Sequence, residues 1–248
     1  MPKERIDILL TQRGLADSRT KAQALVMAGV VLANDRRVEK PSEKVASDAV
    51  IRLKEAATMR YVGRGGLKLE AALTHFGIEP KGWNCLDIGS STGGFTDCLL
   101  QNGASRVVAV DTGTNQLVWR LRSDERVEVL ENTNAREITL AELGGTAFAL
   151  IVMDVSFISA RKILPVCPSL LKPDGQAVVL IKPQFEVGKG EVGKGGIVRE
   201  AEKHERVVKE VNSCAESLGF RLRGTIASPI LGAEGNMEFL SCYLLDDA

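Results

Sequence analysis

Ten residues from Leu86 to Phe95, LDIGSSTGGF, combine a carboxylate with three glycines in a pattern that suits ligand binding. Asp87 ends an apolar run, and the glycines at positions 89, 93 and 94 let the backbone approach a bound molecule closely. A second carboxylate, Asp111, ends the next apolar run, VVAVD, where it is placed to take both hydroxyls of a ribose. Two acids at consecutive strand ends beside a glycine loop predict a site for a nucleoside-containing cofactor.

The glycine spacing separates this loop from a nicotinamide site. A dinucleotide fingerprint reads G-x-G-x-x-G, whereas Gly89 to Gly94 reads G-x-x-x-G-G. The full pattern, D-x-G-x-x-x-G-G-F, resembles the donor loop of S-adenosylmethionine-dependent methyltransferases. That resemblance implies S-adenosyl-L-methionine as cofactor, held by Asp87, Gly89, Ser90, Ser91, Thr92, Gly93, Gly94, Phe95, Asp111, Asn134 and Asp154.

A second glycine motif, GKGEVGK from Gly188 to Lys194, nearly matches a phosphate loop. Gly195 stands where Ser or Thr should bind Mg²⁺, and no helix is predicted to begin there. Two interpretations of residues 185–197 stay open: a mobile, lysine-bearing loop that closes over RNA, or an ordinary surface loop.

Four further charged residues lie near other strand ends. Asp154 follows ALIVM, Lys182 follows AVVLI, Glu238 begins the last apolar run, and Lys68 lies on the helix before the first strand. Two alternative chemistries lack support. The N/D-P-P-F/Y motif of amino-nitrogen methylation reads Asp-Val-Ser-Phe here, and Cys167 has no evident partner to activate it as a nucleophile.

The Lys, Asp, Lys, Glu order of Lys68, Asp154, Lys182 and Glu238 resembles the tetrad of the FtsJ-like ribose 2′-O-methyltransferases. When the pattern of the first sixty residues, described below, and the segment RYVGRGGLKL are added, the whole chain resembles the TlyA (hemolysin A) family. The resemblance implies methylation of cytidine in ribosomal RNA. A ribose hydroxyl is a very weak acid, so Lys182 is expected to accept its proton or orient it. The two carboxylates are expected to hold the lysines, and Lys68 to position the ribose or its phosphate.

One departure from the family pattern lies between the two expected domains. The tetrapeptide Arg-x-Trp-Val of some members reads Met59-Arg60-Tyr61-Val62, so its first Arg is missing and its Trp is a Tyr.

Periodicity predicts the elements that position these residues. Helices are expected over Leu67–Phe76 and Gly94–Gln101, with strands over Trp83–Ile88, Arg106–Val110, Ala147–Met153, Ala177–Ile181 and a final strand in GNMEFLSCYLL. Strands that alternate with helices indicate an α/β, Rossmann-like, doubly wound parallel sheet, whose ligand lies at the carboxyl ends of the strands.

The first sixty residues predict a small α/β domain. A helix is expected over Arg5–Arg13, a second from the N-cap Ser18 to Gly29, then a hairpin that turns at Asn34-Asp35 and a strand over Ala49–Leu53. The patterns R-x-D-x-L-L, S-R-x-x-A and G-x-V resemble the RNA-binding module first known from ribosomal protein S4. A generic cap of two helices and a hairpin is the alternative. We expect an RNA-binding domain at 1–59, a linker at 60–66 and a methyltransferase domain at 67–248.

Charge and aromatic content favour folded RNA as the partner of this module. Residues 1–60 carry twelve Lys and Arg against eight Asp and Glu, although the whole chain has zero net charge. No Phe, Tyr or Trp precedes Tyr61, so the module offers no platform for stacking single-stranded bases. The expected RNA-binding residues are Arg5, Arg13, Arg19, Lys21, Arg36, Arg37 and Arg64, with ribosomal RNA or ribosomal subunits as the partner.

Other classes of protein are not supported. The five cysteines form no C-x-x-C pair, and His75 and His204 have no neighbour at ligand spacing, so no metal site is predicted. The charged N-terminus and the short apolar runs predict a cytoplasmic protein without a membrane span. Three alternatives to the main prediction stay open: a methyltransferase of another RNA, a non-catalytic RNA-binding assembly factor, and the less favoured membrane-lytic hemolysin.

Overall fold

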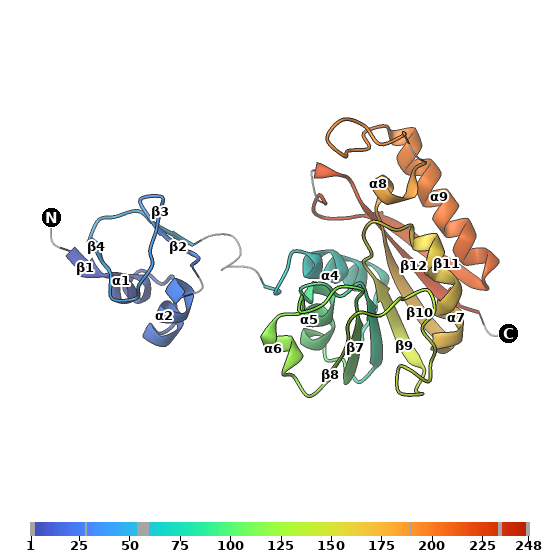
Figure 1. The fold of residues 1–248 in the computed structure, drawn as a ribbon, viewed down its shortest axis with the longest axis horizontal. Coiled ribbons are helices and arrows are strands. Elements are labelled where there is room, and N and C mark those ends of the chain that lie inside the picture. Colours follow the sequence, from blue (N-terminus) through green and yellow to red (C-terminus); the bar gives the residue numbers. More distant parts are fainter. Residues whose placement is uncertain (1–2, 28, 54–59, 189, 233–234, 247–248) are drawn as a thin grey trace. The chain divides into compact units, whose positions relative to one another are not determined.

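The computed structural model describes residues 3–27, 29–53, 60–188, 190–232 and 235–246. The chain divides into two compact units, Met1–Arg60 and Tyr61–Ala248 (Figure 1). Residues 61–66, which the sequence assigned to a linker, belong to the second unit. Each unit has a hydrophobic core of its own and is described separately.

The first unit packs two helices against short antiparallel strands. Its elements are β1 Lys3–Arg5, α1 Ile6–Gln12, α2 Arg19–Met27, β2 Val31–Ala33, β3 Arg36–Arg37, β4 Lys44–Ala46 and β5 Ile51–Leu53. β1 pairs with β4, and β2 lies between β3 and β5. The predicted helices, hairpin and last strand are present, with ends that differ by one or two residues. The three-residue strands β1 and β4 are too short for a periodic signal, and the sequence did not predict them.

Local signals explain why these elements form. The Ser18 hydroxyl accepts a hydrogen bond from the Lys21 backbone N–H at 3.2 Å, which is the N-cap predicted for α2. Asn34 and Asp35 have φ values of 46° and 62°, the left-handed pair that a two-residue hairpin turn requires. The elements of this unit pack around an apolar core that includes Ile6, Leu10, Val26, Val31 and Val38.

A seven-stranded sheet forms the centre of the second unit, in the order β11-β12-β10-β9-β6-β7-β8. Its strands are β6 Asn84–Ile88, β7 Arg106–Val110, β8 Val127–Leu130, β9 Phe148–Met153, β10 Leu171–Ile181, β11 Phe220–Ala227 and β12 Phe239–Leu245. The strands β8, β7, β6, β9 and β10 run parallel, while β12 is antiparallel to both of its neighbours. The order reverses between β6 and β9, which places the switch point, and hence the expected ligand site, at their carboxyl ends.

Helices cover both faces of this sheet (Figure 1). The helices α4 Gly65–Phe76, α5 Gly94–Gln101 and α6 Trp119–Arg122 pack on one apolar cluster. On the other cluster lie α7 Cys167–Leu170, α9 Ala201–Ser217 and two short 3-10 turns, Ala160–Lys162 and Leu164–Val166, with α8 Pro183–Glu186 following β10. Alternate residues of β6 face opposite clusters, Cys85 one and Leu86 the other, because side chains alternate along a strand. The doubly wound α/β fold predicted from the sequence is therefore confirmed.

Candidate active site

The glycine loop between β6 and α5 makes a close backbone contact with the end of β9. Gly89 has a φ of 86°, which favours glycine, and a Cβ built on it would lie 2.4 Å from the carbonyl oxygen of Asp154. Gly93, with a φ of 100°, is the N-cap of α5, and its built Cβ would lie 2.3 Å from the Leu121 side chain. These two glycines let the ends of two parallel strands and a helix meet around one space.

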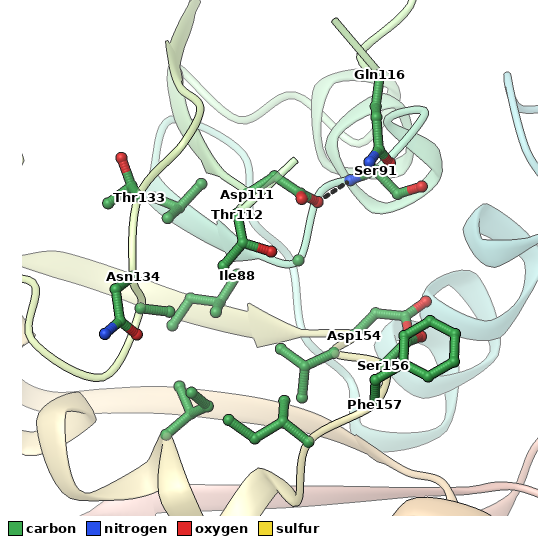
Figure 2. A pocket seen from close by; sticks show the side chains of 16 residues that line it. Ile88, Ser91, Asp111, Thr112, Gln116, Thr133, Asn134, Asp154, Ser156 and Phe157 are labelled. Carbon is green, nitrogen blue, oxygen red and sulfur yellow. Dashed lines mark hydrogen bonds between the residues drawn. The ribbon is translucent and has the colours of Figure 1, made fainter. Parts of the chain in front are cut away.

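Asp111 at the end of β7 is held in a fixed orientation. Its Oδ2 accepts a hydrogen bond from the Ser91 backbone N–H at 2.8 Å (Figure 2), and its Oδ1 accepts one from the Gly113 backbone N–H at 2.7 Å. Because β6 and β7 pair in parallel, Asp111 lies beside the loop that follows β6. The structure thus brings the two consecutive strand ends together as the sequence spacing predicted.

A cavity of about 300 Å³ opens beside Asp111. Its walls combine apolar side chains from the strand ends and the segment after β9 with polar groups that include Asp111, Gln116 and Asn134 (Figure 2). A cavity that combines apolar walls with a carboxylate suits a nucleoside, whose base is apolar on its faces and whose ribose carries hydroxyls.

A second cavity, of about 220 Å³, adjoins the first. The two share the lining residues Gly89, Ser91, Asp154 and Ser156, and we call the two adjoining cavities together the cleft. The second cavity is further lined by the start of α4, the rest of the glycine loop and the lysine after β10, in full Gly63, Arg64, Gly65, Ser90, Thr92, Gly94, Phe95 and Lys182. Of the residues predicted to bind the cofactor, only Asp87 and Gly93 line neither cavity.

The four residues of the predicted tetrad form two lysine–carboxylate pairs. Lys182 Nζ lies 2.5 Å from Asp154 Oδ1 and donates to Ser156 Oγ at 2.8 Å. Lys68 Nζ lies 2.5 Å from Glu238 Oε2, and both of these side chains are buried. Paired burial offsets much of the cost of removing the charges from water.

Strand register explains how these distant residues converge. Ile181 pairs with Phe239 across β10 and β12, so Lys182 and Glu238 occupy the next positions at the same edge of the sheet. Asp154 follows β9, the parallel neighbour of β10, and its Oδ2 lies 3.7 Å from a Cβ built on Gly65 at the start of α4. Lys68 follows one turn later on α4, and this places both pairs at the same edge of the sheet.

Gly232 lies against Glu238, in a contact that sequence reasoning missed. A Cβ built on Gly232 would lie 2.0 Å from Glu238 Oε1, and the Gly232 backbone N–H donates to the Asn236 carbonyl at 2.8 Å. Any side chain at this position would displace the carboxylate that holds Lys68. No local sequence signal marks Gly232, because the contact exists only after the chain folds back on itself.

Asp87 lies beneath the cleft rather than in it. Its side chain is fully buried, and its Oδ2 accepts a hydrogen bond from Thr96 Oγ1 at 2.6 Å. Among the described residues Oδ1 has no hydrogen-bond partner. Burial, with smaller contributions from the charges of Asp154 and Asp111, raises the pKa of Asp87 to about 7. Asp87 therefore supports the glycine loop through α5 rather than facing a ligand directly.

An exposed aromatic residue stands next to the lysine-binding serine. Phe157 is 92% exposed with a φ of 63°, and its ring centroid lies 5.1 Å from that of Phe185. Behind it, the buried carboxylate of Glu186 accepts hydrogen bonds from Ser159 Oγ at 2.5 Å and from Ala160 N–H at 2.7 Å. The segment after β9 is thereby fixed against α8, with Phe157 facing solvent. In the sequence, Asp-Val-Ser-Phe only departs from the amino-nitrogen motif, and no signal there marks Phe157 as an exposed ring.

Cys167, considered above as a nucleophile, is buried, and this burial raises the pKa of its thiol to about 12. A thiol in that environment is not ionised near neutral pH and is a poor nucleophile. The structure thus adds an independent argument against carbon methylation.

The described residues of the predicted 185–197 loop are anchored. Glu191 pairs with Arg206 of α9 at 2.7 Å, and Lys203 donates to the Glu191 carbonyl at 3.0 Å. Asn236 donates to the Gly196 carbonyl and accepts from Val198 N–H. These contacts favour the surface-loop interpretation over a mobile lid.

The predicted RNA-binding residues have several different environments. Arg13 donates to the carbonyls of Ala49 and Ser47, so its guanidinium is used within the first unit. Arg36 pairs with Glu43, whereas Lys21 and Arg37 are exposed. Arg64 belongs to the second unit and lines the cleft. Arg5 and Arg19 both bind the buried carboxylate of Asp7.

Comparison with protein families gives two matches. Residues 61–244 match the FtsJ-like methyltransferase model, and residues 4–51 match the S4 domain. No helix in the described part of the chain is long and apolar enough to cross a membrane.

Individual relatives cover nearly the whole chain. YqxC of Bacillus subtilis is 52% identical over 240 residues, which span 96% of this chain and 84% of YqxC. The 16S/23S rRNA (cytidine-2′-O)-methyltransferase TlyA of Mycobacterium tuberculosis is 44% identical over 96% of this chain and 88% of its own length. Hemolysin A of Brachyspira hyodysenteriae is 42% identical over 97% and 100% of the two chains. A solved structure from Streptococcus thermophilus, 46% identical, superposes with a TM-score of 0.76 over 100% of this chain and 90% of that one.

Proposed function

The chain belongs to the FtsJ-like methyltransferase family and carries an S4 domain before the catalytic unit, as its motifs predicted, and from this premise we propose a substrate and a mechanism. The enzyme transfers a methyl group from S-adenosyl-L-methionine to the ribose 2′-hydroxyl of a cytidine in folded ribosomal RNA. The observation that carries the proposal is the pair of lysine–carboxylate contacts at the edge of the sheet, one of them lining the cleft. The TlyA relative named above supports cytidine in ribosomal RNA as the substrate.

The cleft fits the proposed cofactor. The larger cavity offers apolar walls to an adenine, and Asp111, already oriented by two backbone N–H groups, is placed to accept hydrogen bonds from the ribose hydroxyls. The glycine loop and Asp154 lead from there into the second cavity, toward Lys182. A Cβ at Gly89 would clash with the backbone carbonyl of Asp154, so the close approach of these two lining residues requires glycine. When bound, the cofactor supplies an electrophilic methyl group on a positively charged sulfur.

Lys182 is assigned to the acceptor hydroxyl. Asp154 and Ser156 hold its Nζ at the cleft, where it orients the 2′-hydroxyl or accepts its proton. Fixing the hydroxyl beside the donor replaces a random encounter with an oriented one, which lowers the entropic part of the barrier. Lys68, held by the buried Glu238, positions the ribose or its phosphate from the neighbouring edge of the site.

Recognition of the RNA divides between the two units. The S4 domain supplies basic residues and no aromatic residue, so it reads the backbone and shape of folded RNA. On the catalytic unit, Arg64 lines the cleft, and the exposed ring of Phe157 beside Ser156 offers a stacking face to the target base. Ribosomal RNA as substrate makes ribosomal subunits the partner and the cytoplasm the site of the reaction.

Substitution of Lys182 tests the proposal. Lys182→Ala is expected to reduce methyl transfer to ribosomal RNA by about 100-fold or more, because the hydroxyl loses the group that activates it. Calorimetry is expected to show that the variant still binds S-adenosyl-L-methionine. Lys172→Ala is a matched control, since Lys172 is an exposed lysine near the other end of the same strand. Equal transfer by the two variants would contradict the mechanism, and no transfer by the unaltered enzyme would favour a non-catalytic assembly factor.

A further inference from the structure

A buried carboxylate in the first unit binds two arginines at once. Asp7, on α1, is fully buried. Arg5 donates to it through Nε at 3.0 Å and through an Nη nitrogen at 2.9 Å. Arg19, at the start of α2, donates through Nε at 3.0 Å, and Gln23, one turn later, donates through Nε2 at 3.0 Å. We call these four residues the Asp7 cluster.

The contacts favour the charged form of this carboxylate at neutral pH. Burial alone would favour its protonated form, but the hydrogen bonds, those of Arg5 first, hold the pKa of Asp7 well below its usual range. The two arginines and one carboxylate leave the cluster with a charge of +1. An exposed ion pair contributes little to the free energy of folding because water screens it. Here the shared carboxylate is inaccessible to water, so its attraction for the two arginines is screened much less.

Both arginines keep donors at the surface. The Arg5 side chain is 33% exposed and the Arg19 side chain 56% exposed, although their common partner is not exposed at all. Arg19 uses only Nε toward Asp7, and within the described residues its two Nη nitrogens have no hydrogen-bond partner. Arg5 likewise keeps one Nη nitrogen for an external ligand. Each guanidinium is therefore held from behind while its outer edge faces solvent.

We propose that the Asp7 cluster is a preformed binding site for a backbone phosphate of the RNA, in which Asp7 is the positioning residue. The inference rests on the proposed function, since it concerns the same RNA substrate. A guanidinium is a planar fork that matches two phosphate oxygens, and its geometry must be right for both hydrogen bonds. Asp7 fixes two such forks, one at the end of β1 and one at the start of α2, so the side-chain entropy is lost on folding and not on binding.

Other arginines of the unit lack this arrangement. Arg36 pairs with Glu43, and Arg52 pairs with Asp35, in contacts that lie at the surface. Each of these pairs is neutral, and its acid competes with phosphate for the same donors. The absence of aromatic residues from this unit also leaves backbone contacts as its main means of gripping RNA.

Asp7→Asn in the full-length protein gives the sharpest test, because two views predict opposite signs. Simple electrostatics predicts tighter RNA binding when an acid is removed. The proposal predicts RNA binding about tenfold weaker, measured by filter binding to refolded total ribosomal RNA. The slope of log affinity against log salt concentration is expected to become shallower by about one, the change that corresponds to one lost phosphate contact. The control is Asp35→Asn, which makes the same charge change at an exposed position of this unit. It is expected to bind as tightly as the unaltered protein or slightly more tightly.

Two further variants separate positioning from a merely structural role. As a single substitution, Arg19→Ala is expected to weaken RNA binding strongly. Added to Asp7→Asn in a double variant, it is expected to weaken RNA binding only slightly further, because Asp7 acts through Arg19. Arg19→Lys keeps both the charge and Asp7, and it is expected to weaken binding about fivefold because the fork is lost. Unchanged or tighter binding by Asp7→Asn, additive effects in the pair, or unchanged binding by Arg19→Lys would overturn the proposal.

Failure of this proposal is distinguishable from failure of the proposed function. Binding is measured without methyl donor, so its outcome does not depend on catalysis. At RNA concentrations below saturation, the rate of methyl transfer by Asp7→Asn is expected to fall by the same factor as its RNA affinity. Loss of transfer there, with binding unchanged, would also contradict the assignment of Asp7 to phosphate binding.

Discussion

Asp87 is the residue of the cofactor motif whose environment differs most from what its position in the motif implied. The sequence placed a carboxylate at the end of a strand, facing a ligand. The structure places it in the core, with one hydrogen bond from Thr96 and a pKa raised to about 7 by burial. Between about pH 4 and pH 7 the folded protein therefore holds a proton that the unfolded chain has released. The corresponding stability is fully present below pH 4 and is lost as the pH rises through 7.

Asp87→Asn should remove this dependence on pH. The free energy of unfolding of the unaltered protein falls as Asp87 ionises, whereas the asparagine never ionises. From pH 5 to pH 8, the free energy of unfolding of the variant is therefore expected to rise by about 2 kcal/mol relative to that of the unaltered protein. Urea unfolding at the two pH values measures the change. Asp124→Asn is the control: hydrogen bonds from Arg126 lower the pKa of Asp124, so its contribution is constant over this range. A difference between Asp87→Asn and the unaltered protein that does not vary with pH would contradict the burial argument.

Sequence patterns located the tetrad residues but not their partners. An apolar run that ends in a charge marks a strand end, which was enough to select Asp154 and Lys182. The pairing of Lys68 with Glu238 joins residues 170 positions apart and depends on the register of β10 with β12. Gly232 was missed for the same reason, since its need to be glycine comes from Glu238 alone.

At the scale of elements, the close approach of β6 and β9 defines the cofactor cradle. Gly89→Ala would place a Cβ 2.4 Å from the Asp154 carbonyl oxygen, and would also strain a φ of 86°. We expect affinity for S-adenosyl-L-methionine, measured by calorimetry, to fall about tenfold or more. Gly145→Ala imposes a similar backbone strain, at a φ of 73°, with nothing within 4 Å of the new Cβ. If both variants bound the cofactor equally well, the cradle would not depend on this contact.

Elements with a clear period or a clear boundary were predicted closely, as α4, α5, β6 and β7 show. Short or irregular ones were not. The predicted Ala177–Ile181 strand is the regular part of β10, which extends back to Leu171 through a register shift. The helix α9 carries Val207, Val211 and Ala215 at a helical spacing on one buried face, a signal that was present but not used. The antiparallel direction of β12 was not predictable, because a strand's direction depends on its neighbours rather than on its own residues.

At the scale of the whole molecule, charge is divided between the units. The basic, aromatic-free first unit matches the S4 domain, while the cleft and both lysine–carboxylate pairs belong to the unit that matches the FtsJ-like family. Composition alone gave zero net charge and indicated no partner. The partner class became predictable only when the chain was divided at the point where aromatic residues begin.

The identity of the methylated product tests the central claim most directly. The purified enzyme would be incubated with S-adenosyl-L-methionine and ribosomal subunits that lack the modification, and the digested RNA analysed by mass spectrometry of its nucleosides. We expect 2′-O-methylcytidine as the new product, formed by the unaltered enzyme and by Lys172→Ala but not by Lys182→Ala. A base-methylated nucleoside, methylation of a different ribose, or no methylated product would contradict the proposed function.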